Sequence, residues 1–150
     1  MSITKYIPNT ITCFNLASGC FATIMALQGD LKAAIIWIII AAIFDFSDGL
    51  AARLLKAYSP LGKELDSLSD IVSFGVAPGM SLYVLLAKAV GSLEISGISW
   101  LPYLAFVIPV FSGLRLAKFN VDERQSTSFI GMPVPAHALL WGSLSYVLQP

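Results

Sequence analysis

An uninterrupted apolar run, Ala33 to Phe44, leads directly into the acidic residues Asp45 and Asp48. The run has twelve residues, whereas a helix needs about 20 to cross the hydrocarbon core of a membrane. Only 12% of the 150 residues are charged, 57% are hydrophobic, and the mean hydropathy is +0.79. This indicates an integral membrane protein, because soluble domains carry about 25% charged residues. A spanning helix built on the run must therefore include Asp45, Asp48 and Arg53.

Charged side chains at this depth cannot face lipid without a large penalty, so they are expected to face the interior of a helix bundle or a water-filled cavity. A second acidic pair, Asp66 and Asp70, follows a turn predicted around residues 58–62. The spacing of three residues in the first pair and four in the second puts each pair on one helix face. Two helices in a hairpin would aim both pairs at each other.

Four carboxylates in a weakly polar setting repel one another unless cations lie among them. Because the set contains only oxygen ligands, the expected ions are hard divalent cations such as Mg²⁺ or Mn²⁺. The alternative interpretation is a polar helix hairpin that only lines a bundle. It does not explain why four acidic residues and Arg53 lie together.

The spacing also forms a recognisable motif. The stretch is Asp45-x2-Asp48-Gly49-x2-Ala52-Arg53-x8-Gly62-x3-Asp66-x3-Asp70. It resembles the signature of the CDP-alcohol phosphotransferases, integral membrane enzymes of phospholipid synthesis, at all eight fixed positions. Further stretches at residues 73–79, 115–120 and 129–136 are similar to the phosphatidylserine synthase branch of that family. Together the similar stretches cover most of residues 9–136.

The resemblance implies a reaction in which a phosphatidyl group passes from CDP-diacylglycerol to the hydroxyl of L-serine and CMP is released. The implied metal ligands are Asp45, Asp48, Asp66 and Asp70, which would hold Mg²⁺ or Mn²⁺, with two ions expected. Asp70 is also the implied general base. The implied nucleotide-binding residues are Asn9, Thr12, Gly49, Ala52, Arg53 and Gly62. Asn9, Thr12 and Asn15 are polar residues near the start of the first helix, and Thr12 and Asn15, three residues apart, could share a face with the nucleotide site. The alternative is that they cap and solvate the start of that helix.

An amino-acid acceptor needs a cation for its carboxylate, and an arginine can bind a carboxylate through two hydrogen bonds. Arg115 and Lys118 are three residues apart on one predicted helix face, and Asn120 lies near the end of that helix. These three residues are the predicted acceptor-binding group. The alternative for the two cations is that they anchor the helix at the membrane surface.

The predicted fold is an all-α polytopic bundle in a single domain, residues 1–150, with four complete membrane-spanning helices and part of a fifth. The complete helices are expected at about residues 10–27, from 31 to beyond 53, from 61–65 to about 90 with a kink at Pro78, and at 100–119. The family commonly has six such helices, so we expect the sequence to be truncated at its C-terminus. The resemblance also implies a homodimer. The small residues proposed for contacts between protomers are Gly75, Gly79, Ser112 and Gly113.

Basic residues are distributed unevenly between the two ends of the predicted bundle. One end carries Lys5, Arg53, Lys56, Lys63, Arg115, Lys118 and Arg124, and the other carries Lys32 and Lys88. Because cytoplasmic loops are enriched in Lys and Arg, the acidic hairpin is expected to face the cytoplasm.

Other functions were weighed against serine transfer. The net charge of zero gives no basic surface for nucleic acid. The same reaction with glycerol phosphate or inositol phosphate as acceptor remains open, and such acceptors favour a denser basic pocket. A cation transporter with acids along an ion path is a more remote alternative, since no second copy of the acidic hairpin is visible. Release of CMP would distinguish the enzyme from the transporter.

Overall fold

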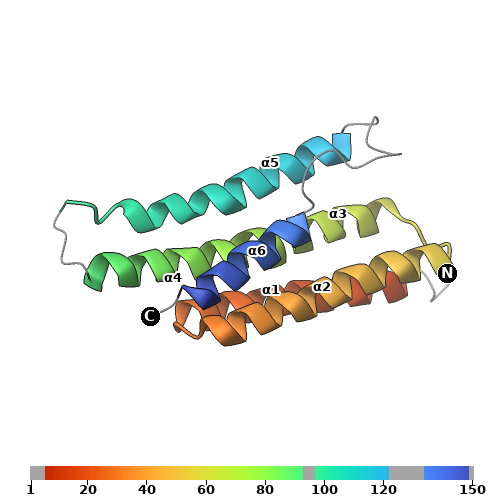
Figure 1. Ribbon diagram of the computed structural model, residues 1–150. Helices are drawn as coiled ribbons and strands as arrows, with labels where there is room; N and C mark the ends of the chain where they lie inside the picture. The colour runs from red at the N-terminus through yellow and green to blue at the C-terminus, as the bar shows by residue number, and fades with distance from the viewer. Residues whose placement is uncertain (1–5, 93–96, 122–133, 149–150) are drawn as a thin grey trace.

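The computed structural model describes residues 6–92, 97–121 and 134–148, and every regular element in these ranges is a helix (Figure 1). The α-helices are α1 (Tyr6–Leu27), α2 (Leu31–Leu54), α3 (Pro60–Asp70), α4 (Ala77–Ser92), α5 (Val107–Val121) and α6 (Val134–Val147), joined by a π-helical segment (Ile71–Val76) and a 3₁₀ helix (Leu101–Phe106). Among the described residues, four stretches are long and apolar enough to cross a membrane, namely Tyr6–Leu27, Leu31–Leu54, Pro60–Ser92 and Leu101–Val121. The predicted polytopic bundle is therefore confirmed, and α6 corresponds to the predicted partial fifth helix.

Helix α1 begins at Tyr6, four residues earlier than the sequence suggested. Pro8 is compatible with this start, because the first turn of a helix does not use the backbone N–H that proline lacks. The hydroxyls of Thr10 and Thr12 donate to the carbonyl oxygens of Tyr6 and Pro8, at 2.9 and 3.0 Å. Asn9 is thus part of the helix and not of a polar segment that precedes it.

The turn between α2 and α3 brings the two acidic pairs together. Lys56 adopts a positive φ of 50° directly after α2 ends. The Ser59 hydroxyl then caps α3 by accepting from the backbone N–H of Gly62, at 3.0 Å, with Pro60 at the first helical position. Gly62 consequently lies in the first turn of α3, so that helix starts slightly earlier than predicted.

The predicted kink at Pro78 takes the form of the π-helical segment that immediately precedes it. The N–H of Ala77 bonds to the carbonyl oxygen of Val72, five residues back, where an α-helix would use the fourth. This wider turn accommodates a proline, whose ring crowds the carbonyl four residues before it and which has no N–H to donate. The third span is therefore one helix with a local widening near its middle.

Small residues around this widened turn bring α5 against the third span. A Cβ on Gly75 would lie 3.3 Å from Cβ of Ser112, and a Cβ on Gly79 would lie 2.9 Å from Cδ of Pro109. The prediction that Gly75, Gly79 and Ser112 contact another protomer is therefore wrong, because they pack within this chain. Gly113 alone among the four has nothing within 4 Å of its Cβ position.

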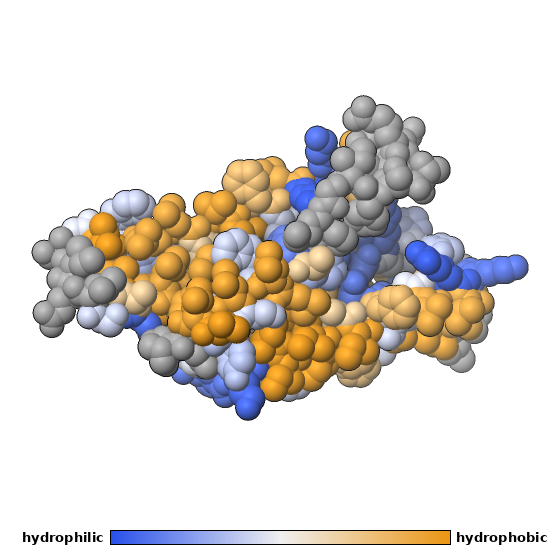
Figure 2. All heavy atoms as spheres, in the orientation of Figure 1, coloured by the Kyte–Doolittle hydropathy of each residue, from blue (hydrophilic) through white to orange (hydrophobic). Residues whose placement is uncertain are grey.

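The core is built largely from alanines, which let neighbouring helices approach closely. One cluster of buried residues joins α1, α2, the third span and α6 through Ala22, Ile38, Ala41, Phe74, Ala77, Val134 and Ala138. Figure 1 shows α1 and α2 side by side and α5 on the opposite side of the bundle. Hydrophobic residues cover the middle of the face in Figure 2, and hydrophilic ones gather at the end where α2 meets α3.

Candidate active site

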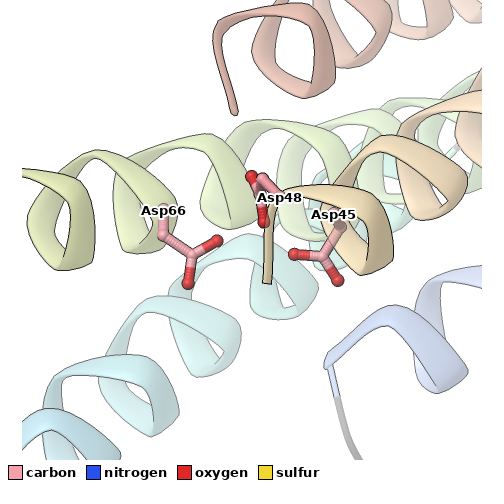
Figure 3. Close-up of side chains that lie close together, drawn as sticks. All are labelled: Asp45, Asp48 and Asp66. Carbon is pink, nitrogen blue, oxygen red and sulfur yellow. The ribbon is translucent and has the colours of Figure 1, made fainter. Parts of the chain in front are cut away.

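Three of the four motif aspartates converge at one point between α2 and α3. Asp45 and Asp48 extend from α2 and Asp66 from α3, and their carboxylates point toward one another (Figure 3). One carboxylate oxygen of each aspartate lies within 4.8 Å of one carboxylate oxygen of each of the other two. Asp70, one turn further along α3, lies close to Asp45 and lines the same cavity as the other three aspartates. The hairpin thus gathers all four acids, as the spacing predicted.

The surroundings of these carboxylates suit divalent cations. Asp48 accepts a hydrogen bond from the Thr12 hydroxyl at 2.5 Å. Oδ1 of Asp66 and Oδ1 of Asp70 are buried and have no hydrogen-bond partner among the described residues. Buried anionic oxygens without partners are costly, and a hard cation would satisfy them with the oxygen ligands that Mg²⁺ and Mn²⁺ prefer. The residues present therefore fit a metal site.

A cavity of about 500 Å³ opens on one side of the acids, between the first turns of α1 and α3 and the end of α2. Five of the six predicted nucleotide-binding residues line it, namely Asn9, Thr12, Gly49, Ala52 and Gly62. The two glycines keep it open in different ways. Within the part of the chain that the structure describes, a Cβ on Gly49 would meet nothing within 4 Å, whereas one on Gly62 would lie 2.9 Å from the side-chain oxygen of Asn9. The sixth residue, Arg53, does not line this cavity.

A second cavity, of about 530 Å³, lies on the other side of the acids against α5. All four aspartates line it, together with Arg53, Lys63, Arg115 and Asn120. Asn120 donates from Nδ2 to the Ser67 hydroxyl at 2.7 Å, which ties the end of α5 to α3. Lys118 lines neither cavity, which favours the alternative that it anchors the helix at the membrane surface.

The two cavities meet at four residues that line both, Asp48, Gly49, Lys63 and Asp66. Lys63 was not among the predicted site residues. Its Nζ also reaches the carbonyl oxygen of Asn120, at 3.4 Å. Spacing is the signal that would have found it, because Lys63 precedes Asp66 by three residues and Asp70 by seven, on one face of α3.

The helix bundle thus holds four aspartates between two adjoining cavities, and comparison with known proteins identifies the family. Residues 5–150 match the CDP-alcohol phosphatidyltransferase family, and the chain belongs to it. A member of this family is an enzyme of that class. The alternative, in which the acids form the ion path of a cation transporter, is therefore not needed.

Curated relatives in this family carry serine-specific names. The chain is 38% identical to a CDP-diacylglycerol–serine O-phosphatidyltransferase from Bacillus subtilis, over 97% of the chain and 78% of the relative. It is also 38% identical to one from Mycobacterium leprae, over 97% of the chain and 48% of the relative. An archaetidylserine synthase from Methanothermobacter thermautotrophicus is 35% identical, over 91% and 57%. No solved structure matches the chain.

Proposed function

We propose that this enzyme transfers a phosphatidyl group from CDP-diacylglycerol to the hydroxyl of L-serine and releases CMP. The observation that carries the proposal is the position of the acids between two cavities of different lining. One cavity holds five of the six predicted nucleotide-binding residues, and the other holds Asp70 and Arg115. The relatives' names support serine as the acceptor.

The cytidine end of the substrate belongs in the first cavity, beside Asn9, Thr12 and Ala52. Its pyrophosphate then lies where the cavities meet, against Gly49, where the backbone leaves room for a ligand. Lys63 lines both cavities and pairs with a phosphate oxygen as a mobile point charge. Arg53, on the second cavity, supplies another cation for the phosphates.

The acceptor belongs in the second cavity. The Arg115 guanidinium binds the serine carboxylate in bidentate fashion. Arg53 and Lys63 are assigned to the phosphates of the donor, which leaves Arg115 among the cations of this lining. A single guanidinium suits the carboxylate of serine better than the phosphate dianion of glycerol phosphate or inositol phosphate. Asn120 is already bonded to Ser67, so its role is to hold the end of α5, and therefore Arg115, over the acids.

In the reaction, the serine hydroxyl oxygen attacks the phosphorus of the phosphatidyl group. The bond from that phosphorus to the bridging oxygen of the pyrophosphate breaks, and CMP leaves with that oxygen. Asp70 accepts the hydroxyl proton as general base. Two divalent cations held by Asp45, Asp48, Asp66 and Asp70 would neutralise phosphoryl charge and orient the reacting oxygens.

We extend the proposal to the setting of the enzyme. Among the described residues, the end of the bundle with the acids carries most of the basic residues, and Lys32 and Lys88 lie at the other end, where Lys88 Nζ reaches the Gly29 carbonyl oxygen at 3.5 Å. This asymmetry supports a cytoplasmic active site. Lys5 and Arg124, also used in the sequence argument, lie outside the described residues. A homodimer remains a proposal drawn from the family resemblance.

CMP release by the purified full chain in lipid tests the function. L-Serine should support release with CDP-diacylglycerol, excess EDTA should abolish it, and added Mg²⁺ or Mn²⁺ should restore it. Faster release with glycerol phosphate or inositol phosphate than with L-serine would contradict the acceptor. Full activity in excess EDTA would contradict the metal site.

A further inference from the structure

Asn15 is a polar residue in the buried core of the bundle. It lies in α1 one turn beyond Thr12 and is 0% exposed. Neither Oδ1 nor Nδ2 of its side chain has a hydrogen-bond partner among the described residues. A buried amide that makes no hydrogen bond destabilises a fold, so an apolar residue of similar size would suit the packing better.

The packing of α1 on α2 fixes which acid lies opposite Asn15. The two helices are antiparallel neighbours (Figure 1), and the hydrogen bond from Thr12 to Asp48 sets their register. Moving three residues forward on α1 and three back on α2 leads from this pair to Asn15 and Asp45. Asn15 and Asp45 therefore lie at about the same height along the bundle axis, one helical turn from the Thr12–Asp48 pair.

The packing of α1 on the third span places a second acid at the same height along the bundle axis as Asn15 and Asp45. The Ser69 hydroxyl donates to the carbonyl oxygen of Thr12 at 3.3 Å, and the Ser73 hydroxyl donates to that of Asn15 at 3.0 Å. Asp70 lies between these two serines in the chain. Its carboxyl group lies close to that of Asp45 and lines the same cavity, and its Oδ1 is itself buried without a partner among the described residues.

We infer that Asn15 is a positioning residue of the metal site, whose side-chain amide donates to the Asp45–Asp70 carboxylate pair when that pair holds a divalent cation. The inference rests on the proposed function, because it takes the four aspartates as metal ligands. An amide suits this position because it offers two N–H donors to charged carboxylates without adding charge of its own. Hydrogen bonds of this kind fix the orientation of metal-binding carboxylates.

Asn15→Leu separates this role from a purely structural one. Leucine has the same branched arrangement of side-chain heavy atoms and no polar atoms, so the variant removes the unpaired amide without opening a large cavity. The metal-free variant should be as stable to heat as the wild type or more so. A residue that matters only for packing would show the opposite pattern, with lower stability and unchanged metal affinity.

Ser145→Ala is the matched control. Ser145 is 1% exposed, and its hydroxyl also lacks a partner among the described residues. It lies on α6 beyond Gly142, whose Cβ position faces Ile35 of α2. Ile35 is ten residues before Asp45, or about 15 Å along a helix at 1.5 Å per residue. Ser145→Ala therefore removes a similar unpaired group far from the acids.

The experiment measures Mn²⁺ binding to the full chain in lipid nanodiscs, from the electron paramagnetic resonance signal of free Mn²⁺, together with thermal unfolding without metal. Asn15→Leu and Asn15→Ala should each bind Mn²⁺ about 10- to 100-fold more weakly than the wild type, the usual effect of removing a group that orients a metal ligand. Ser145→Ala should bind like the wild type, and Asn15→Leu should keep the wild-type unfolding temperature.

Two results would overturn the inference. The first is wild-type Mn²⁺ affinity in both Asn15 variants, and the second is an equal loss of affinity in Ser145→Ala, which would indicate general loosening of the bundle. CMP release by the wild type with L-serine is measured in parallel. Its absence would overturn the proposed reaction, whereas the comparison of Mn²⁺ affinities would still decide the role of Asn15.

Discussion

Asp45 and Asp48 come from the same face of α2 but have different neighbours. Asp48 accepts a hydrogen bond from Thr12 and lines both cavities. Asp45 lines only the second cavity and contacts Asp70, whose side chain is 8% exposed. The four acids are therefore not equivalent, and single substitutions should have distinguishable effects.

Replacing Asp45 or Asp70 by asparagine should separate metal binding from proton transfer. Both variants should fold, since each removes one of several mutually repelling charges. CMP release by Asp45→Asn should recover in part at high Mg²⁺, because its defect is metal affinity. CMP release by Asp70→Asn should stay at least about 100-fold lower at every Mg²⁺ concentration, the scale of losing a general base.

The measurement is CMP release against Mg²⁺ concentration with L-serine as acceptor. Binding of CDP-diacylglycerol should survive in Asp70→Asn, which serves as the control for an intact nucleotide site. Recovery of Asp70→Asn to near wild-type rates at high Mg²⁺ would show that Asp70 is a metal ligand only.

Gly49→Ala should impair substrate binding without harming the fold. A Cβ at this position meets no protein atom within 4 Å, and alanine favours helix over glycine by roughly 1 kcal/mol. The added methyl group would project where the two cavities meet, so the KM for CDP-diacylglycerol should rise several-fold. Gly113→Ala, equally unhindered but lining neither cavity, is the control and should leave KM unchanged. A wild-type KM in Gly49→Ala would remove Gly49 from the site.

At this scale, the spacing of the acids was enough to predict the cluster, because residues three or four apart share a helix face. The surroundings of Asn15 were not predictable in the same way. The hydrogen bond from Ser73 to Asn15, and the position of Asp70 at the same height along the bundle axis, each relate residues more than 50 positions apart. Both depend on how three helices pack. The bond between Asn120 and Ser67 escaped prediction for the same reason.

Among the elements, the third span controls where α5 lies. Gly75 and Gly79 allow close contact with Ser112 and Pro109 of α5, and α5 carries Arg115 toward the acids. The sequence predicted a kink at Pro78 from the chemistry of proline. It did not predict the π-helical segment at residues 71–76, which also packs against α5 and α6.

Gly79→Val should destabilise the bundle at this contact. A Cβ there already falls 2.9 Å from the Pro109 ring, so the larger side chain must push α5 away at a cost of roughly 1–3 kcal/mol. Displacing α5 moves Arg115, so the KM for L-serine should rise more than that for CDP-diacylglycerol. Thermal unfolding and the two KM values measure these effects.

Gly91→Val is the control for this substitution. Gly91 lies in the last turn of α4, and its Cβ position has nothing within 4 Å. This variant should unfold like the wild type and keep both KM values. Equal destabilisation by the two substitutions would mean that valine is poorly tolerated anywhere in α4. The effect of Gly79→Val could then not be attributed to the contact with Pro109.

For the whole molecule, hydropathy and length were enough to predict the number of membrane-spanning stretches, because every backbone polar group within lipid must be satisfied inside a helix. The pairing of those helices was less predictable. Apolar residues favour lipid and protein neighbours almost equally, so the sequence pattern does not show which face of a spanning helix is inside. For that reason the small residues Gly75 and Gly79 are equally compatible, from sequence alone, with a contact between protomers and with the contact inside the chain that the structure shows.

Cysteine labelling in intact cells should establish which end of the bundle faces the cytoplasm. Lys56, in the turn after α2, and Lys32, in the first turn of α2, are both exposed and lie at opposite ends of that helix. Each is changed to cysteine separately, after Cys13 and Cys20, which are exposed on α1, have been replaced by alanine.

The basic residues near the acids favour the cytoplasmic side for Lys56. A membrane-impermeant maleimide should therefore label Lys32→Cys in intact cells and Lys56→Cys only after the membrane is opened. CMP release by each variant confirms that it is folded. Labelling of Lys56→Cys in intact cells, with Lys32→Cys protected, would reverse the orientation and place the active site on the outer face.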